Sequence, residues 1–381
     1  MRKFLSRWIP GRLSRQQLRQ IYRLGLVVAA VAIALVWQQF RQPNQPLGEE
    51  PSVKHQMAAV SRESDFRESD FRESDFGESD FGIREPIQPI PAALPYDLDK
   101  YALGKRLFRE PRLSRNEQIS CASCHQFEFG GADSRRYSEG VAGTLTQVNT
   151  PTIFNIVYNF RLNWDGQYDS LAVHTNNLMQ NPSVMGGVWE DILPKIAEAD
   201  GYRQAFETLY TDGISPENIV DAIVTYESAL TTPNAAFDRY LKGDRSAISA
   251  DAKAGYDLFK AYGCASCHQG TNVGGNMFQK FGVLGDYFSD RGDITQADLG
   301  RFNVTGVERD RYVFRVPSLR NVAITPPYLH DGSAQTIKEA IKIMVKYQLG
   351  RPIPAADIEQ IAEFLATLTG EVLAGETATA Q

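Results

Sequence analysis

The chain contains two copies of a five-residue unit in which a spaced pair of cysteines is followed at once by a histidine: Cys121-Ala-Ser-Cys-His125 and Cys264-Ala-Ser-Cys-His268. The units hold all four cysteines of the sequence and lie 143 positions apart. A zinc ribbon would separate its cysteine pairs by about 15 to 20 residues, and a redox dithiol would not explain a histidine after both pairs. The spacing fits covalent haem attachment, with the thiols joined to the haem vinyl groups and the histidine bound to iron. We therefore predict two covalently bound haem c groups.

Length and composition indicate a globular protein with two domains. The 381 residues exceed one domain of ordinary size, and the 43% of hydrophobic residues are enough to build cores. The net charge of −6 offers no basic face to a phosphate backbone. No nucleic-acid partner is predicted, whereas a basic redox protein could be attracted.

Residues 1–40 have the pattern of an export signal or membrane anchor. Basic residues without acidic ones precede an apolar run from Leu24 to Trp37, which is shorter than the roughly 20 residues that span a bilayer comfortably. The Ala-x-Ala triplet at residues 32–34 lies inside that run, where it makes a poor cleavage site. We therefore favour an uncleaved anchor over a cleaved signal peptide. The basic flank then places the rest of the chain in the periplasm or another extracytoplasmic space, tethered to the inner membrane.

A tether is predicted over residues 41–91. The segment is rich in Gln, Pro, Glu and Ser and repeats Arg-Glu-Ser-Asp-Phe at 62–66, 67–71 and 72–76. A five-residue period matches neither a helix nor a strand, and the units carry too little apolar surface to offset the entropy of ordering. We expect a disordered spacer without chemistry.

After Tyr96 the apolar pattern is helical. Ser215 and Pro216 begin one predicted helix that reaches Leu230, and a capping box of Thr336 and Glu339 begins another. A third helix is expected from about Ala355 to Thr369. The predicted fold class is mostly α: two c-type cytochrome domains over residues 92–240 and 241–371, each around one haem with long loops, followed by a tail at 372–381.

Considered with Met344, the chain resembles the bacterial di-haem cytochrome c peroxidase family, which includes the MauG-type oxidases. The resemblance runs from about Leu103 to Gly370. The stretches that carry it are Gly104-Lys-Arg-Leu-Phe-Arg-Glu-Pro-Arg-Leu-Ser114, Gly130-Gly-Ala-Asp133, Asn163-Trp-Asp-Gly166, Tyr312-Val-Phe-Arg315, Leu319-Arg-Asn-Val322 and Pro327-Tyr-Leu-His-Asp-Gly332.

The resemblance implies different roles for the two haem groups. The haem at His125 would be the low-potential centre that reacts with peroxide, and the haem at His268 would be the high-potential entry point for electrons, with Met344 as its second axial ligand. A thioether ligand raises the reduction potential of haem iron. Trp164 matches the family's tryptophan between the haems, and a packed interdomain aromatic is its plain alternative.

The resemblance further implies a calcium ion between the domains. Asn149, Thr325 and Pro327 match the family's calcium positions, and their oxygen atoms suit this cation. Family members are often dimers, so a homodimer is a further expectation.

Three positions around the first haem depart from the family pattern. Val141 stands where the peroxidases commonly have a removable histidine ligand, and His174 and Val184 replace a glutamine and a glutamate. The glutamate matters most, because cleavage of the peroxide O–O bond needs a group that moves a proton. His174 could take that role or could bind the iron. Glu190 and Glu139 are further candidates if the alignment shifts by a few residues.

The leading functional prediction is a peroxidase that reduces hydrogen peroxide to water with electrons from a small c-type cytochrome or copper protein. A MauG-like oxidase acting on a protein or small-molecule substrate is one alternative; the altered pocket favours it and Met344 opposes it. A non-catalytic di-haem electron carrier, with His174 as sixth ligand of the first iron, is the other.

Overall fold

The computed structural model of the protein describes residues 85–92 and 95–372. The predicted anchor, nearly all of the tether and most of the tail lie outside the described residues. Within the described part, no helix is both long enough and apolar enough to cross a membrane. All described residues belong to one compact unit.

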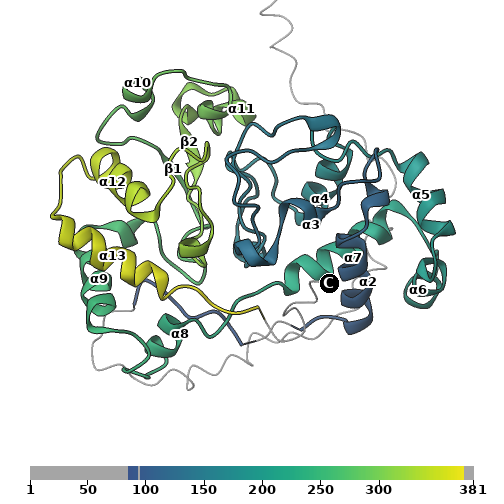
Figure 1. Ribbon diagram of the computed structural model, residues 1–381, viewed down its shortest axis with the longest axis horizontal. Coiled ribbons are helices and arrows are strands. Elements are labelled where there is room, and N and C mark those ends of the chain that lie inside the picture. Colours follow the sequence, from purple (N-terminus) through teal and green to yellow (C-terminus); the bar gives the residue numbers. More distant parts are fainter. Residues whose placement is uncertain (1–84, 93–94, 373–381) are drawn as a thin grey trace, which may run out of the picture. The chain divides into compact units, whose positions relative to one another are not determined.

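The described elements are mainly α-helices and short 3-10 helices joined by long loops (Figure 1). The α-helices are α2 (Leu98–Phe108), α3 (Cys121–Cys124), α4 (Leu171–Gln180), α5 (Trp189–Glu198), α6 (Tyr202–Leu209), α7 (Pro216–Ala229), α8 (Ala236–Leu241), α9 (Ala250–Ala261), α10 (Tyr287–Arg291), α11 (Phe302–Thr305), α12 (Ile337–Gln348) and α13 (Ala355–Ala366). The 3-10 helices are η3 (Pro111–Leu113), η4 (Phe127–Phe129), η5 (Val141–Gly143), η6 (Ile156–Tyr158), η7 (Cys264–Ser266), η8 (Ala297–Leu299), η9 (Glu308–Asp310) and η10 (Val322–Ile324). The mostly helical fold predicted from the sequence is confirmed.

The only strands of the described part are β1 (Phe278–Lys280) and β2 (Val313–Arg315), which pair antiparallel with Phe278 opposite Arg315. Phe314 of β2 belongs to a cluster of buried aromatic side chains that includes Phe281 and Phe288.

The predicted helix starts are confirmed. Ser215 Oγ accepts the N–H of Asn218 at the start of α7, and Pro216 is its first residue. At α12 the Thr336 hydroxyl accepts the N–H of Glu339 while the Glu339 carboxylate accepts the N–H of Thr336. These bonds satisfy backbone donors that a helix start leaves without partners.

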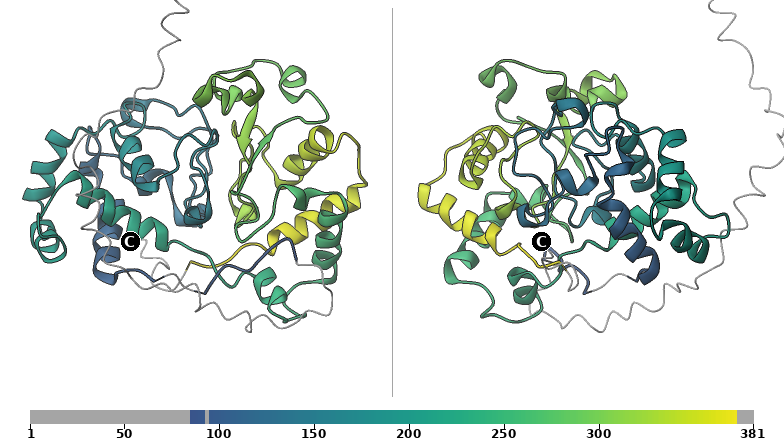
Figure 2. Two further views of the ribbon diagram at one scale, coloured as in Figure 1. Left: turned by 180° about the vertical axis from the view of Figure 1, so that it is seen from behind. Right: turned by 45° about the vertical axis from the view of Figure 1, so that its right-hand side comes forward.

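Each Cys-x-x-Cys-His unit follows a helix that carries a close-packed glycine. α2 packs against α7, and α9 packs against α13, where the C-terminal yellow helix of Figure 2 meets the green one. A Cβ at Gly104 would collide with the carbonyl oxygen of Ala222, and one at Gly255 would collide with that of Gln360. Glycine is therefore required at both crossings, because the backbones approach too closely for any side chain.

The described chain has two halves, each built around one large hydrophobic core. The first core is built from residues between Leu103 and Leu230, and the second from Ile87 and residues between Phe237 and Leu368. Phe237 precedes the predicted domain division at 240/241, which otherwise stays a prediction.

The chain ends extend the cores beyond the predicted domain limits. Ile87 and Ile90, assigned to the end of the disordered tether, are 1% and 0% exposed, and Ile87 joins the second core. Val372, assigned to the tail, packs against the first core. Both limits were wrong at these residues, because the average polarity of a segment hides single apolar side chains that find a place in a core.

Candidate haem-binding sites

The first cysteine unit forms a single helical turn, α3. The N–H of Ser120 donates to Ser123 Oγ at 3.0 Å, and the N–H of His125 donates to the Cys121 carbonyl oxygen at 3.0 Å. Residues three and four apart share one face of a helical turn. The turn therefore presents Cys121, Cys124 and His125 to the same side.

The ring of His125 is held by a backbone carbonyl. Its Nδ1 lies 2.9 Å from the carbonyl oxygen of Gly131, and since a carbonyl only accepts, Nδ1 carries the proton. Nε2 then keeps the lone pair that a metal ligand needs. Desolvation by the surrounding protein lowers the pKa of His125, which favours this neutral form.

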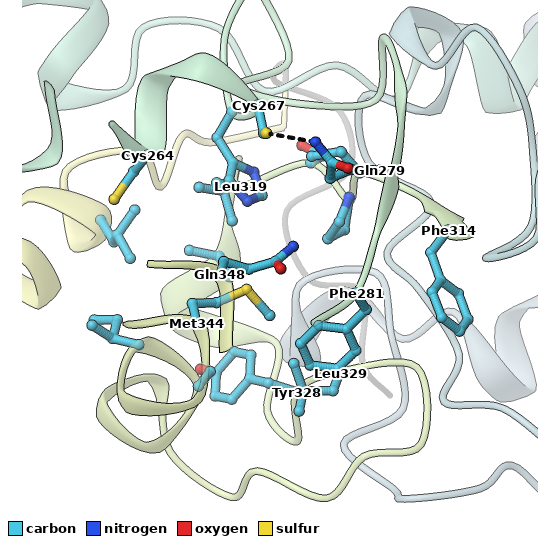
Figure 3. Close-up of a pocket in the computed structure, with 18 of the residues that line it drawn as sticks. Cys264, Cys267, Gln279, Phe281, Phe314, Leu319, Tyr328, Leu329, Met344 and Gln348 are labelled. Atoms are coloured by element: carbon cyan, nitrogen blue, oxygen red, sulfur yellow. Dashed lines mark hydrogen bonds between the residues drawn. The ribbon is translucent and has the colours of Figure 1, made fainter. Parts of the chain in front are cut away.

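The second cysteine unit borders a cavity of about 440 Å³. As in the first unit, the N–H of the histidine, here His268, donates to the carbonyl of the first cysteine, Cys264, at 3.0 Å. Cys264, Cys267 and His268 line the cavity together with Met344 of α12. Figure 3 shows Met344 across the cavity from Cys267. Imidazole and thioether are a ligand pair of c-type haem iron, so these donors fit a haem.

Burial keeps His268 neutral, lowering its pKa to about 4. The backbone at Val273 and Pro317 opposes this shift weakly, yet neither group meets hydrogen-bond geometry, and Nδ1 has no partner among the described residues. A phenylalanine from the preceding helix lies beside each haem histidine, with ring centroids 6.4 Å apart for Phe108 and His125 and 6.5 Å apart for Phe259 and His268.

Two of the three altered pocket positions are apolar and joined to each other. Val141 is 1% exposed, and its N–H donates to the carbonyl oxygen of Val184 at 2.9 Å. Val184 packs against the first core. Neither side chain can bind iron or carry a proton, so any such role in this region must come from another residue.

His174 of α4 has a defined place. Its Nε2 lies 2.9 Å from Asn163 Oδ1, and its ring meets Tyr168 edge to face at 5.4 Å between centroids. With Asn163 as acceptor, Nε2 donates and Nδ1 keeps a lone pair. Burial lowers the pKa of His174 to about 4, with smaller contributions from His125 and Arg315. The structure thus brings His174 within electrostatic range of the first haem histidine.

The other acid–base candidates differ in burial. Glu190 is exposed, and Glu139 is exposed and paired with Arg135 at 3.8 Å. Sequence reasoning missed Glu227 of α7, which is 6% exposed and accepts a hydrogen bond from the Thr175 hydroxyl at 3.0 Å. Burial raises its pKa to about 8. Burial also raises the pKa of the Cys121 thiol, with a smaller contribution from Glu227. The available signal was its position, four residues after Ile223 on the apolar stripe of that helix.

Trp164 lies at the edge of the cavity of the second unit. Its indole Nε1 donates to the carbonyl oxygen of Asn149 at 2.8 Å, and its own carbonyl oxygen accepts the N–H of Arg315 at 2.9 Å. The ring therefore has a fixed orientation between residues of the two halves.

The structure brings the three predicted calcium residues to the lining of the same cavity: Asn149, Thr325 and Pro327. Asn149 Nδ2 donates to the carbonyl oxygen of Arg135 at 2.8 Å, and within the described chain its side-chain oxygen accepts no hydrogen bond. Among the described residues no group of three His, Cys, Asp or Glu side chains could hold a metal. A calcium site here would depend on amide and carbonyl oxygens.

His330, from the stretch Pro327-Tyr-Leu-His-Asp-Gly332, is 2% exposed and hydrogen bonds through Nε2 to Asp298 Oδ1 at 2.7 Å. Arg291 joins Asp298 to Asp331. His330 is thus held in a buried polar network.

Residues 98–246 match the family model of the di-haem cytochrome c peroxidases. The cytochrome c551 peroxidase of Nitrosomonas europaea is 40% identical over 288 residues, which cover 75% of this chain and 85% of the relative.

The chain belongs to the di-haem cytochrome c peroxidase family. The cytochrome c peroxidase Ccp of Escherichia coli K12 is 44% identical over 75% of this chain, and the match spans 61% of that longer relative. Among solved structures, a MauG-like protein associated with microbial copper homeostasis is similar with a TM-score of 0.64 and 27% identity, over 77% of this chain and 95% of that one. The predicted family membership is confirmed.

Proposed function

We propose that this member of the family reduces hydrogen peroxide to two molecules of water, taking two protons and two electrons, and that a small c-type cytochrome or copper protein supplies the electrons. The observation that carries the proposal is the asymmetry of the two sites. His268 and Met344 line one cavity with both thiols of the second unit. His125 instead lies near the nitrogen base His174. In the same half, Val141 and Val184 stand where the family commonly has polar residues.

The residues that would hold the cofactors follow from the two units. Cys121 and Cys124 would attach one haem c with His125 as its ligand, and Cys264 and Cys267 would attach the other. The bound haem groups would store the electrons and offer the iron that peroxide reaches. His268 and Met344 would give the second haem the higher potential, so that it receives electrons first. The indole of Trp164, fixed by Asn149, would lie on the route between the halves.

His174 would handle the proton in place of the family's glutamate. Above pH about 4 its ring is neutral, so Nδ1 can accept a proton from one peroxide oxygen and return it to the other. The hydrogen bond from Nε2 to Asn163 would hold the ring and stabilise its cationic form. Val141 offers no ligand that must leave before peroxide binds, so the oxidised protein should react without prior reduction.

The remaining proposals concern location and assembly. Residues 1–40 would anchor the chain to the inner membrane with the haem domains in the periplasm. Asn149, Thr325 and Pro327 would bind a calcium ion between the halves, and the protein would form a homodimer.

The test begins with optical and EPR spectra of the full-length oxidised protein, followed by peroxide and then by a ferrous cytochrome. A high-spin haem that reacts with peroxide and then oxidises the cytochrome supports the proposal. Two low-spin haems indifferent to peroxide would instead favour an electron carrier. A MauG-like oxidase, favoured by the altered pocket, would react with peroxide but oxidise the cytochrome slowly.

His174→Ala tests the proton role. We expect His174→Ala to react with peroxide roughly 100-fold or more slowly, without a change in haem spin state. In the wild type, protonation of His174 should lower the rate only as the pH falls to about 4. Asn177→Ala, on the exposed face of the same helix, is the matched control. An unchanged rate in the His174 variant would remove the assignment, and a low-spin to high-spin change would make His174 an iron ligand.

A further inference from the structure

Arg315 is a buried cation without a counter-charge in the described chain. It ends β2, is 4% exposed and makes no ion pair among the described residues. Its Nε donates to the carbonyl oxygen of Asn163 at 3.2 Å, and Nη1 donates to Asn159 Oδ1 at 3.1 Å. Both partners are neutral. Burial lowers the pKa of Arg315 only to about 10, so the guanidinium remains charged at neutral pH.

A second buried arginine, Arg320, lies five residues after Arg315 and is fully compensated. Arg320 pairs with Asp238 at 2.7 Å, both side chains being 0% exposed, and donates to two backbone carbonyls. Isolated charges in a protein interior are costly unless paired. The contrast between the two arginines therefore indicates that the partner of Arg315 is an anion that the described part of the chain does not supply.

The position of Arg315 identifies that anion. Arg315 lines the cavity that His268 and Met344 share, and a haem carries two carboxylate groups on one edge. A guanidinium fork matches a carboxylate geometrically. We propose that Arg315 is the charge partner of a carboxylate of the haem attached at Cys264 and Cys267.

This contact would also link the second haem to the first site. Asn163 contacts both sites: its carbonyl oxygen accepts from the Arg315 side chain, and its side-chain oxygen is hydrogen bonded to His174. The carbonyl oxygen of the next residue, Trp164, accepts the backbone N–H of Arg315. A change of charge at the second haem would thus act on Arg315 and, through one residue, on His174. The inference rests on the proposed haem attachment but not on peroxide reduction.

The experiment is a redox titration of the full-length di-haem protein, without peroxide, for wild type, Arg315→Gln and Arg315→Lys. Arg301→Gln is the matched control, since Arg301 donates to the carbonyls of Asp165 and Gly166 but does not line the cavity. Loss of a nearby positive charge disfavours addition of an electron. We expect Arg315→Gln to lower the reduction equilibrium constant of the second haem about tenfold, which is about 59 mV for one electron.

Arg315→Lys keeps the positive charge, so the logarithm of the reduction equilibrium constant should change less than half as much as in Arg315→Gln. Arg301→Gln should leave this constant unchanged. The resonance Raman band of the haem carboxylate side chains should move in Arg315→Gln alone. An equal midpoint in wild type and Arg315→Gln would overturn the proposal, as would a shift confined to the first haem. If the variants fail to assemble, the wild-type midpoint must be independent of pH between 5 and 8; a slope of about 59 mV per pH unit would mean that the carboxylate is protonated on reduction and unpaired.

Discussion

Glu227 offers the sharpest test of the buried electrostatics beside the first haem unit. Its carboxyl group is 6% exposed, and the Thr175 hydroxyl is its only hydrogen-bond partner in the described chain. Burial raises its pKa from 4.5 to about 8. Because the folded pKa lies above the unfolded one, the unfolded chain releases this proton first as the pH rises. The folded protein therefore loses stability between pH 4.5 and about 8, by about 1.4 kcal/mol per pH unit.

Replacing Glu227 by Gln removes this dependence while keeping an oxygen that accepts from Thr175. At pH 7 the relieved penalty is on the order of 3 kcal/mol, reduced by about 1 kcal/mol for a buried amide N–H without a partner. We expect Glu227→Gln to be equal to wild type or slightly weaker at pH 5, about 2 kcal/mol more stable at pH 7, and more so at pH 8.

The assay is denaturant unfolding of the full-length di-haem protein at several pH values, followed by circular dichroism. Glu207→Gln, at an exposed position of α6 in the same half, is the control and should leave the pH dependence unchanged. If wild type and Glu227→Gln show the same slope of unfolding free energy between pH 5 and 8, Glu227 is ionised in the folded protein and the reasoning fails.

Two further predictions concern the proposed ligand Met344 and the close helix crossings. Met344→Ala should lower the potential of the haem at His268 by on the order of 0.1 V, a fraction of the roughly 0.8 V that axial ligands span; a redox titration checks this, and an unchanged midpoint would mean that Met344 is a core residue and no ligand. Gly255→Ala should destabilise the protein by about 1 to 3 kcal/mol despite the higher helix propensity of alanine, because its Cβ would strike the Gln360 carbonyl. Denaturant midpoints measure the effect, and Gly104→Ala should behave alike; a gain in stability in either variant would refute the close crossing.

Much of the helical framework could be predicted because its signals are local. Ser215, Pro216 and the Thr336–Glu339 box mark helix starts through bonds that reach only three residues along the chain. The close crossings at Gly104 and Gly255 could not be predicted in this way, since a glycine inside a helical pattern shows its purpose only when the partner helix is known. The ordered ends at Ile87 and Val372 were missed for the same reason.

The two Cys-x-x-Cys-His units by themselves predicted the cofactor, haem c, because the attachment motif and its adjacent histidine occupy only five consecutive residues. The tertiary structure decided what surrounds each unit. Met344 faces the second unit from 76 residues further along the chain. Arg315 is buried, and among the residues that the structure describes it has no counter-charge. His174 and Glu227 owe their shifted pKa values to burial. Burial and charge compensation depend on segments far apart in sequence, so no local pattern can carry them.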